Sequence, residues 1–326
     1  MARLQALGIA YIGITGGEPL LRKDVGEIIR SVDDRSIVIL STNGKALSRK
    51  RALALKQAGL FSLAVSLDSA DPDTHNRSRG DRDAFESALE AIRISAQAGL
   101  YTMVHAVVLK KELSREHLFK LFKLVKREGA HEVRIHEPVP CGGVLHAGNG
   151  DGVFYSEQDH RRLFRIQFAA NRKLTRFPKV SSLPYTEHPT KFGCCAGVLH
   201  SYITSSGDFC PCDFVPVSFG NVLKENVTDL YDRMNHAMGV PRKGCWGIRI
   251  APSLRGKELP LDPSETLGLC RSEATREYPR FFKDLQTSRN GEHKLPHVKE
   301  ERQELEYMVC PECSSSLSTT PGNRSE

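Results

Sequence analysis

A chain of 326 residues and 36.3 kDa is long enough to bury a sizeable core, either as one large α/β domain or as one domain with an extension. Hydrophobic residues make up 40% and charged residues 26%, and no apolar run reaches the length of a membrane-spanning helix. The formal charge of +7 comes from Lys and Arg scattered among Asp and Glu, so we expect neither a nucleic-acid partner nor a membrane partner.

The amino-terminal segment carries an apolar stretch but no small-residue cleavage site, so we read no signal peptide and expect a cytoplasmic protein. Nine cysteines in such a chain are unsuited to structural disulfides, because a reducing compartment keeps thiols free for metal or redox work. Metal ligation is therefore the question that the cysteines raise.

Short β-branched apolar runs predict buried strands, and segments with helical apolar spacing lie between them. The predicted strands cover 9–15, 37–40, 61–67, 101–109 and 133–135, and the predicted helices cover 25–32, 85–96 and 118–125. This alternation favours repeated βα units with parallel strands, in a barrel or in an open doubly wound sheet. Gly59, Gly99 and Gly129 each stand where a left-handed helix cap favours glycine.

The character of the chain changes after about residue 140. A glycine-rich loop at 141–152 precedes an amphipathic segment at 156–173, for which Ser156 is the predicted N-cap. Most cysteines lie farther on, in loop-rich sequence that predicts a small domain held by metal. We expect domains at 1–175 and 176–275 and an extension at 276–326, whose polar end is predicted to be disordered.

A Gly16-Gly17-Glu18-Pro19 turn directly follows the first predicted strand. In a βα barrel such a loop lies at the mouth where ligands bind, and two glycines let the backbone approach a ligand closely. The alternative is an ordinary tight βα turn.

The next two predicted strands also end in polar residues. Ser41-Thr42-Asn43-Gly44 follows one, and Ser66-Leu67-Asp68-Ser69 follows the other, with His75 and Arg79 farther along. Three consecutive strand ends with hydroxyl, amide and carboxylate groups predict a binding site at one end of the sheet.

This ordered set of motifs resembles the radical S-adenosylmethionine (SAM) superfamily over about residues 1–140. The resemblance implies an α/β fold, a partial (β/α)6 barrel whose first strand is missing from this chain, with a small cysteine-rich carboxyl-terminal domain. It also implies a set of SAM-binding residues: Gly16, Gly17, Glu18, Pro19, Ser41, Asn43, Ser66 and Arg79. Asp68 and His75 are expected to brace the loop by local capping.

The chain departs from the family in one respect. The family's Cys-x3-Cys-x2-Cys loop, which binds the catalytic 4Fe-4S cluster, is not found, and no cysteine precedes Cys141. We therefore assign no catalytic residue and expect that the sequence is truncated at its amino terminus, before the cluster loop. An unpaired strand edge there predicts poor solubility.

A second group of cysteines surrounds a predicted hairpin at Tyr202 to Gly207. Its spacing resembles the opening of SPASM and twitch domains, which bind an auxiliary iron-sulfur cluster. By that resemblance the ligands are Cys195, Cys212, Cys245 and Cys270, with Cys194 and Cys210 as substitutes. Inert buried thiols are the alternative. Cys310 and Cys313 either complete a metal site or stand idle in the tail.

The resemblance implies a cytoplasmic enzyme that forms a 5'-deoxyadenosyl radical to abstract hydrogen, in peptide or protein modification or in cofactor biosynthesis. Its cofactors would be S-adenosyl-L-methionine and a 4Fe-4S cluster. Its partners would be a small-molecule or peptide substrate and a reductant such as flavodoxin or ferredoxin. The alternative is a non-catalytic or degenerate iron-sulfur or adenosyl-binding paralogue, or a gene fragment.

Overall fold

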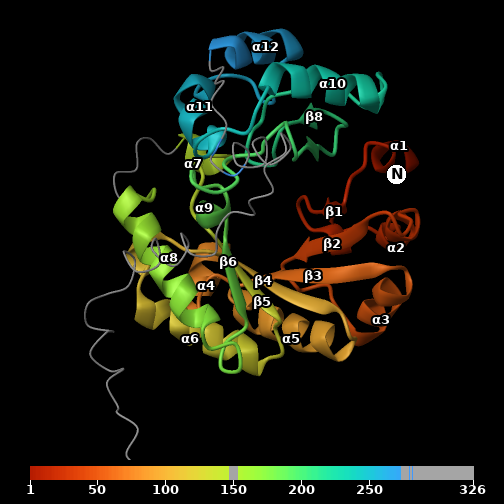
Figure 1. Ribbon diagram of the computed structural model, residues 1–326. Helices are drawn as coiled ribbons and strands as arrows, with labels where there is room; N and C mark the ends of the chain where they lie inside the picture. The colour runs from red at the N-terminus through yellow and green to blue at the C-terminus, as the bar shows by residue number, and fades with distance from the viewer. Residues whose placement is uncertain (147–152, 273–278, 280, 282–326) are drawn as a thin grey trace, which may run out of the picture.

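A computed structural model describes residues 1–146, 153–272, 279 and 281 (Figure 1). The predicted disordered end and the pair Cys310 and Cys313 lie outside these residues. The α-helices are α1 (Ala2–Gln5), α2 (Val25–Arg30), α3 (Arg49–Gln57), α4 (Pro72–Arg79), α5 (Ala84–Gln97), α6 (Arg115–Arg127), α7 (Gly143–His146), α8 (Glu157–Asn171), α9 (Leu183–Thr186), α10 (Val227–Met238), α11 (Trp246–Leu254) and α12 (Pro263–Ser272). Two 3-10 helices are η1 (Pro19–Leu21) and η2 (Lys110–Glu112).

A sheet of six parallel strands in the order β1 to β6 forms the first unit. Its strands are β1 (Tyr11–Ile14), β2 (Ile37–Thr42), β3 (Leu60–Ser66), β4 (Tyr101–Val107), β5 (Glu132–His136) and β6 (Lys179–Ser182). The five predicted strands are all present, and the prediction of an α/β fold with parallel strands is confirmed. The predicted poor solubility stays a prediction, but β1 is the edge strand and pairs only with β2 among the described residues.

Strand β6 was missed by the sequence analysis, because Val180 is the only strongly apolar residue in its four positions. The strand pairs with β5 from Glu132↔Lys179 to Ile135↔Ser182. The sheet therefore continues past residue 175, where the first domain was expected to end.

Helices cover one face of the sheet only (Figure 1). Leu40, Leu63, Val104 and Ile135 point to that face and are fully buried in the larger hydrophobic core. Each such side chain contributes roughly 1.5–3 kcal/mol to stability relative to an exposed position. The predicted cap of α8 is present as a capping box, in which Ser156 accepts from the backbone N–H of Asp159.

The opposite, inner face of the sheet carries polar side chains at the alternate positions. Ser66 pairs in register with His105, and His105 pairs with Arg134. This face is turned toward the second unit, which contains α10, α11 and α12 (Figure 1).

The second unit has its own hydrophobic core, in which Trp246, Phe209 and Phe219 are completely buried. The predicted hairpin is confirmed as the antiparallel strands β7 (Tyr202–Ile203) and β8 (Phe209–Cys210). Leu4 and Leu7 pack against this core from the amino-terminal segment, so the two ends of the described chain meet here.

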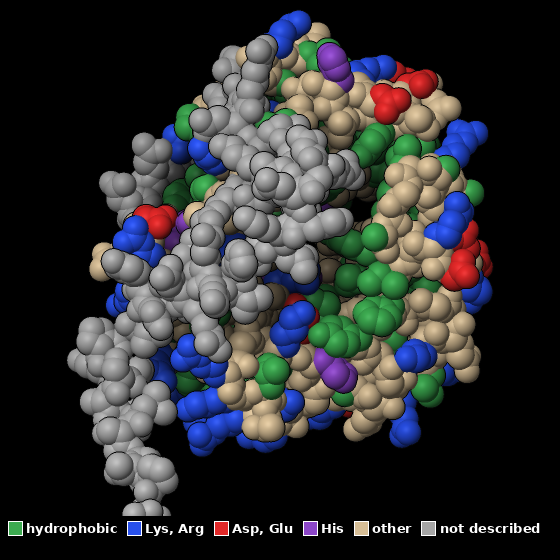
Figure 2. Space-filling view, viewed as in Figure 1, with side chains coloured by type: hydrophobic (Ala, Val, Ile, Leu, Met, Phe, Trp, Pro, Cys, Tyr) green, Lys and Arg blue, Asp and Glu red, His purple; other side chains and the backbone are tan. Residues whose placement is uncertain are grey.

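The surface agrees with the scattered charge of the sequence. Figure 2 shows Lys and Arg side chains on several separate parts of the visible face, and a hollow between the two units with hydrophobic side chains at its edge. None of the described helices combines the length and the apolar character needed to cross a bilayer.

We predict that Gly44→Ala destabilises the barrel by about 2–4 kcal/mol, because its backbone and its neighbours both oppose a side chain. The φ angle of Gly44 is +89°, and a Cβ there would lie 2.7 Å from Ala91 Cβ and 3.0 Å from the Ser87 carbonyl oxygen. Urea unfolding followed by circular dichroism measures the change.

Gly26→Ala is the matched control, since Gly26 lies within α2 and a Cβ there would meet only the flexible end of Arg30. Alanine at this helical position should raise the free energy of unfolding by roughly 0.5–1 kcal/mol. Equal losses in both variants would contradict the packing argument.

Candidate functional site

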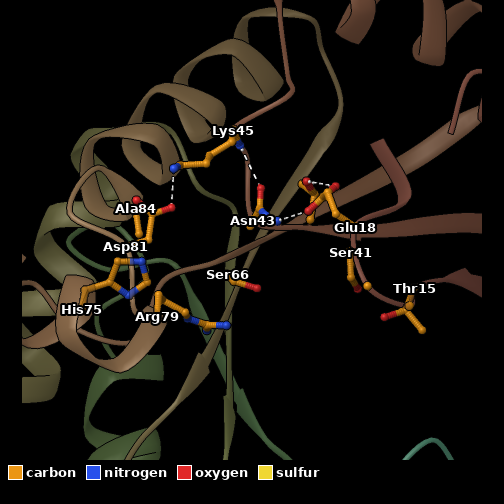
Figure 3. A pocket seen from close by; sticks show the side chains of 13 residues that line it. Thr15, Glu18, Ser41, Asn43, Lys45, Ser66, His75, Arg79, Asp81 and Ala84 are labelled. Carbon is orange, nitrogen blue, oxygen red and sulfur yellow. Dashed lines mark hydrogen bonds and ion pairs between the residues drawn. The ribbon is translucent and has the colours of Figure 1, made fainter. Parts of the chain in front are cut away.

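A cleft of about 320 Å³ opens at the carboxyl ends of β1, β2 and β3 (Figure 3). Its lining residues are Thr15, Gly16, Gly17, Glu18, Ser41, Thr42, Asn43, Lys45, Ser66, His75, Arg79, Asp81 and Ala84. All the predicted SAM-binding residues except Pro19 line this cleft. Pro19 is buried at the first position of the 3-10 helix η1 and shapes the turn from within the protein.

The Glu18 carboxylate ties the first two strand ends together. It accepts hydrogen bonds from Thr42 Oγ1 at 2.7 Å and from the backbone N–H groups of Asn43 at 2.8 Å and Leu20 at 3.0 Å. Since both carboxylate oxygens are occupied in this way, Glu18 fixes the shape of the cleft, and the backbone and side chains around it are left to meet a ligand. The φ angle of Gly16 is +135°, which favours glycine at the start of this turn.

Asp68 holds Arg79 at the opposite wall of the cleft. Arg79 donates from Nε to one oxygen of Asp68 at 2.8 Å and from Nη2 to the other at 2.6 Å. The same carboxylate accepts from the backbone N–H of Val107 at 3.0 Å and from Ser78 Oγ at 3.1 Å. Arg79 keeps its side chain one-third exposed, and Nη1 has no hydrogen bond to the described residues, so this atom can reach a bound anion.

His75 braces Asp68, because its Nδ1 atom accepts a hydrogen bond from the Asp68 backbone N–H at 3.2 Å. Burial alone would raise the pKa of Asp68, but interactions with His75 and Arg79 outweigh it and hold the pKa below its ordinary value. The ion pair of Lys45 with Asp81 closes the rim of the cleft (Figure 3) and was missed by the sequence analysis, because its partners lie in different loops.

In the second unit, Cys194 lies against Cys245 at the amino-terminal end of α11. The hydrogen bond from Cys245 lowers the pKa of the Cys194 thiol to about 6. The backbone N–H groups of Trp246 and Ala196 lower this pKa as well, whereas burial raises it. The same contact between the two thiols, together with burial, raises the pKa of Cys245.

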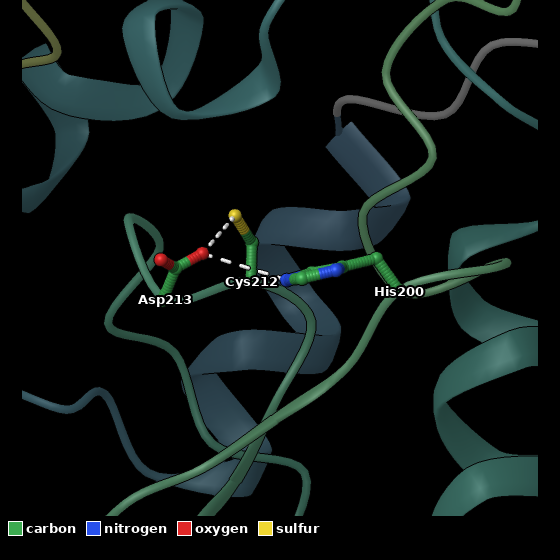
Figure 4. A group of neighbouring side chains, drawn as sticks. All are labelled: His200, Cys212 and Asp213. Atoms are coloured by element: carbon green, nitrogen blue, oxygen red, sulfur yellow. Dashed lines mark hydrogen bonds and ion pairs between the residues drawn. The ribbon is translucent and has the colours of Figure 1, made fainter. Parts of the chain in front are cut away.

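Cys212 stands beside His200 and Asp213, and the ligand atoms of these three residues lie within 4.8 Å of one another (Figure 4). Asp213 Oδ1 is 3.3 Å from Cys212 Sγ and 3.4 Å from His200 Nε2. Burial raises the pKa of Cys212, and the charges of Asp213 and Cys194 raise it further, so these groups lie within electrostatic reach. Spacing along the sequence gave no reason to group His200 with Cys212.

The remaining thiols point elsewhere. Cys195 Sγ faces the carbonyl of Gly193 at 3.7 Å, and Cys210 Sγ faces that of Asp208 at 3.9 Å. Cys270 Sγ lies 3.7 Å from the sulfur of Met238 inside the apolar core. Of the four predicted ligands, Cys245 contacts Cys194, the charge of Cys194 acts on both Cys212 and Cys195, and Cys270 lies in the apolar core.

The structure has groups suited to both cofactors that the resemblance implies, SAM and a 4Fe-4S cluster. The cleft offers glycine backbone, hydroxyls, an amide and a guanidinium, which match the amino, hydroxyl and carboxylate groups of SAM. Near the second site, Cys194 is already disposed to be a thiolate, the form that ligates iron-sulfur clusters.

We predict that Asp68→Asn lowers the free energy of unfolding by about 2–4 kcal/mol above pH 5, because it leaves Arg79 without its charged partner. The pKa of Asp68 is lower in the folded chain than its ordinary value of 3.8. Its contribution is therefore present above that value and is lost as the pH falls through the folded pKa, so the two chains should converge in acid. Urea titrations across pH 3–7 measure this.

Asp24→Asn is the control, since Asp24 forms a similar paired contact with Arg22 on the open surface. Water screens that pair, and the variant should unfold like the parent chain. An equal loss in both variants would mean that the barrel does not depend on the buried carboxylate.

The chain is similar in sequence to known proteins. A family model described as the radical SAM superfamily matches residues 1–125. Over 291 residues, 82% of the chain, it is 30% identical to the AdoMet-dependent heme synthase of Methanosarcina barkeri, of whose length it covers 79%. A GTP 3',8-cyclase of Petrotoga mobilis is 36% identical over 147 residues, 44% of the chain and 45% of that protein.

Solved structures agree in fold. Streptococcus suis SuiB bound to its precursor peptide SuiA superposes with a TM-score of 0.55 at 15% identity, over 71% of this chain and 55% of that one. Native anSMEcpe with bound AdoMet and the Cp18Cys peptide gives a TM-score of 0.55 at 17% identity, over 76% of this chain and 72% of that one. This chain thus spans little more than half the length of SuiB. The chain belongs to the radical SAM superfamily, whose members are enzymes that use S-adenosylmethionine and a 4Fe-4S cluster.

Proposed function

We propose that this chain belongs to an enzyme that uses SAM bound in the strand-end cleft to abstract hydrogen from a substrate, in cofactor biosynthesis or in peptide or protein modification. When bound with a reduced 4Fe-4S cluster, SAM supplies a 5'-deoxyadenosyl radical. The single observation that carries the proposal is the convergence of all three polar strand-end motifs on one cleft.

In this proposal each part of the cleft meets a different part of SAM. The backbone of Gly16 and Gly17 receives the methionyl amino group, Ser41 and Asn43 line the site, and Ser66 approaches the ribose or the carboxylate. The exposed edge of the Arg79 guanidinium binds the carboxylate, while Asp68 holds the opposite edge.

We further propose that the second unit is a SPASM- or twitch-type domain, and that Cys194, Cys212 and Cys245 ligate an auxiliary cluster. This set replaces Cys195 of the spacing argument with its neighbour Cys194, because the Cys194 sulfur lies against Cys245 and is the more acidic thiol. Cys195 and Cys270 are candidates for a fourth ligand.

The relatives favour cofactor biosynthesis over peptide modification as the setting. Heme synthases resemble the chain in sequence over most of its length, whereas the peptide-bound SuiB and anSMEcpe structures resemble it in fold. A flavodoxin or ferredoxin is the proposed reductant, and the cytoplasm is the proposed location.

We predict that Arg79→Lys weakens SAM binding about tenfold, since lysine cannot hold Asp68 and a ligand carboxylate through opposite edges of a planar fork. Isothermal titration of the anaerobically purified chain with SAM measures the change. Because Cys-x3-Cys-x2-Cys is not found in the sequence, the assay follows binding and not turnover.

Arg22→Lys is the matched control, because Arg22 pairs with Asp24 on the surface and does not line the cleft. It should bind SAM like the parent chain. Failure of the parent chain to bind SAM, or equal binding by Arg79→Lys, would refute the assignment of the cleft.

Iron content tests the proposed cluster ligands. After anaerobic reconstitution with iron and sulfide, the parent chain should hold about four iron atoms. Replacement of Cys194, Cys212 or Cys245 by alanine should remove most of this iron, because each substitution takes away a thiolate ligand. Parallel variants of Cys195 and Cys270 identify the fourth ligand.

Cys210→Ala is the control, since the Cys210 thiol faces a backbone carbonyl and its pKa is raised to about 12 by burial and by Asp208. This variant should keep its iron. Circular dichroism of every variant separates loss of a ligand from loss of the fold. An iron-free parent chain, or full iron in Cys194→Ala, would overturn the proposed set.

A further inference from the structure

A row of polar side chains begins at the cleft and crosses the inner face of the sheet. Ser66, His105, Arg134 and Ser181 are register partners on the neighbouring strands β3 to β6. Since neighbouring strands are about 4.8 Å apart, Arg134 lies roughly 10 Å from Ser66 across the sheet. Ser66 lines the cleft, so the row runs directly from the proposed SAM site into the barrel.

Two imidazoles of this region have an unused hydrogen-bonding atom. His105 and His136 lie side by side on β4 and β5, with ring centroids 5.0 Å apart. The Nε2 atom of each is shielded from solvent and has no hydrogen-bond partner among the described residues. Buried polar atoms are nearly always paired in native proteins, so these two neighbouring atoms are available to a hydrogen-bonding ligand.

Arg134 can also accept a further partner for its guanidinium group. Its Nη2 atom is 3.5 Å from Glu132 Oε1, longer than the 2.7–2.9 Å typical of a charge-assisted hydrogen bond. Glu132 does not depend on this contact, because it already binds Ser181 Oγ at 2.7 Å and Tyr101 Oη at 3.0 Å. Over one-third of the Arg134 side chain is exposed, so its guanidinium can take a new partner.

The charges around the imidazoles limit the kind of partner. Burial lowers the pKa of His105 to about 3, helped by the charges of His136 and Arg134, and burial with Arg134 lowers the pKa of His136 to about 4. Asp213 of the second unit opposes both shifts, and Asp68 at the cleft opposes the shift of His136. At neutral pH the row therefore offers two neutral imidazoles and one guanidinium, whose charge is partly offset by the Glu132 carboxylate at 3.5 Å, and this suits a monoanion better than a dianion.

Position connects this row with the chemistry of both sites. Asp213 acts electrostatically on both His105 and His136, and it follows Cys212, a proposed cluster ligand, in the chain. The row thus lies between the SAM cleft and the second unit.

We propose that His105, Arg134 and His136 form a binding site for a carboxylate of the substrate, on the inner face of the barrel. Arg134 supplies the charge and His105 and His136 supply N–H donors, while the rest of the substrate extends toward Ser66. This proposal rests on the proposed function and adds the substrate class to it. The three residues are positioning residues that hold the substrate and leave the chemistry to SAM.

Butyrate serves as the probe, because it carries a single carboxylate. The experiment records 1H–15N spectra of the full chain with 15N-labelled histidine rings, at constant ionic strength set by sodium chloride. Butyrate should shift the ring signals of His105 and His136 in a saturable manner, whereas butyramide, its uncharged analogue, should not. The absence of a saturable shift at both rings would overturn the proposal.

Arg134→Gln should weaken butyrate binding at least tenfold, and Arg161→Gln should leave it unchanged. Arg161 is the matched control because it pairs with Glu157 on the surface of α8. Equal binding by Arg134→Gln and the parent chain would overturn the proposal, as would tighter binding of inorganic phosphate than of butyrate.

His136→Gln provides a second test that does not require the Arg134 variant to fold. This variant should also weaken butyrate binding. The titrations need neither SAM nor iron. A failure here would therefore leave the proposed SAM and cluster sites intact, and failure of those tests would leave this one readable.

Discussion

The structure depends on the strict alternation of side chains along six parallel strands that are covered by helices on one face only. The positions that point outward, such as Leu63 and Val104, are fully buried and supply the core. The alternate positions point to the other face of the sheet, so they can be polar without disturbing this core. The groups proposed to bind SAM or substrate lie on this second set of positions, on the loops that follow the strands or, in the case of Arg79, at the end of α4.

The cleft is organised by two carboxylates, each of which accepts hydrogen bonds from several protein groups. Glu18 joins the ends of β1 and β2, and Asp68 joins the end of β3 to α4 and to the backbone of β4. Both act by accepting several hydrogen bonds at once, so the glycine turn and the Arg79 guanidinium are held in place before a ligand arrives. This arrangement reduces the ordering that binding would otherwise require.

The second unit keeps its thiols at the edge of an apolar core built around Trp246. Burial there disfavours thiolates, yet Cys194 is acidic because Cys245 and two backbone N–H groups donate to it. Asp213 extends the influence of this unit to the inner face of the barrel, where His105 and His136 respond to its charge. The two units thus face a common space, consistent with one substrate meeting both sites.

The alternation of strands and helices, the hairpin and the three strand-end motifs could be predicted from the sequence, because periodicity and turn residues are local signals. It also indicated the family. Strand β6 was missed because its stability comes from pairing with β5 and not from its own apolar residues.

Which atoms meet depends on the three-dimensional fold and could not be predicted from the sequence. Spacing favoured Cys195 over its neighbour Cys194, but adjacent side chains point in different directions, and spacing does not record direction. Likewise, His105 and Arg134 are 29 positions apart, and only strand register makes them neighbours. Contacts of this kind arise from pairing between distant segments, which no local pattern records.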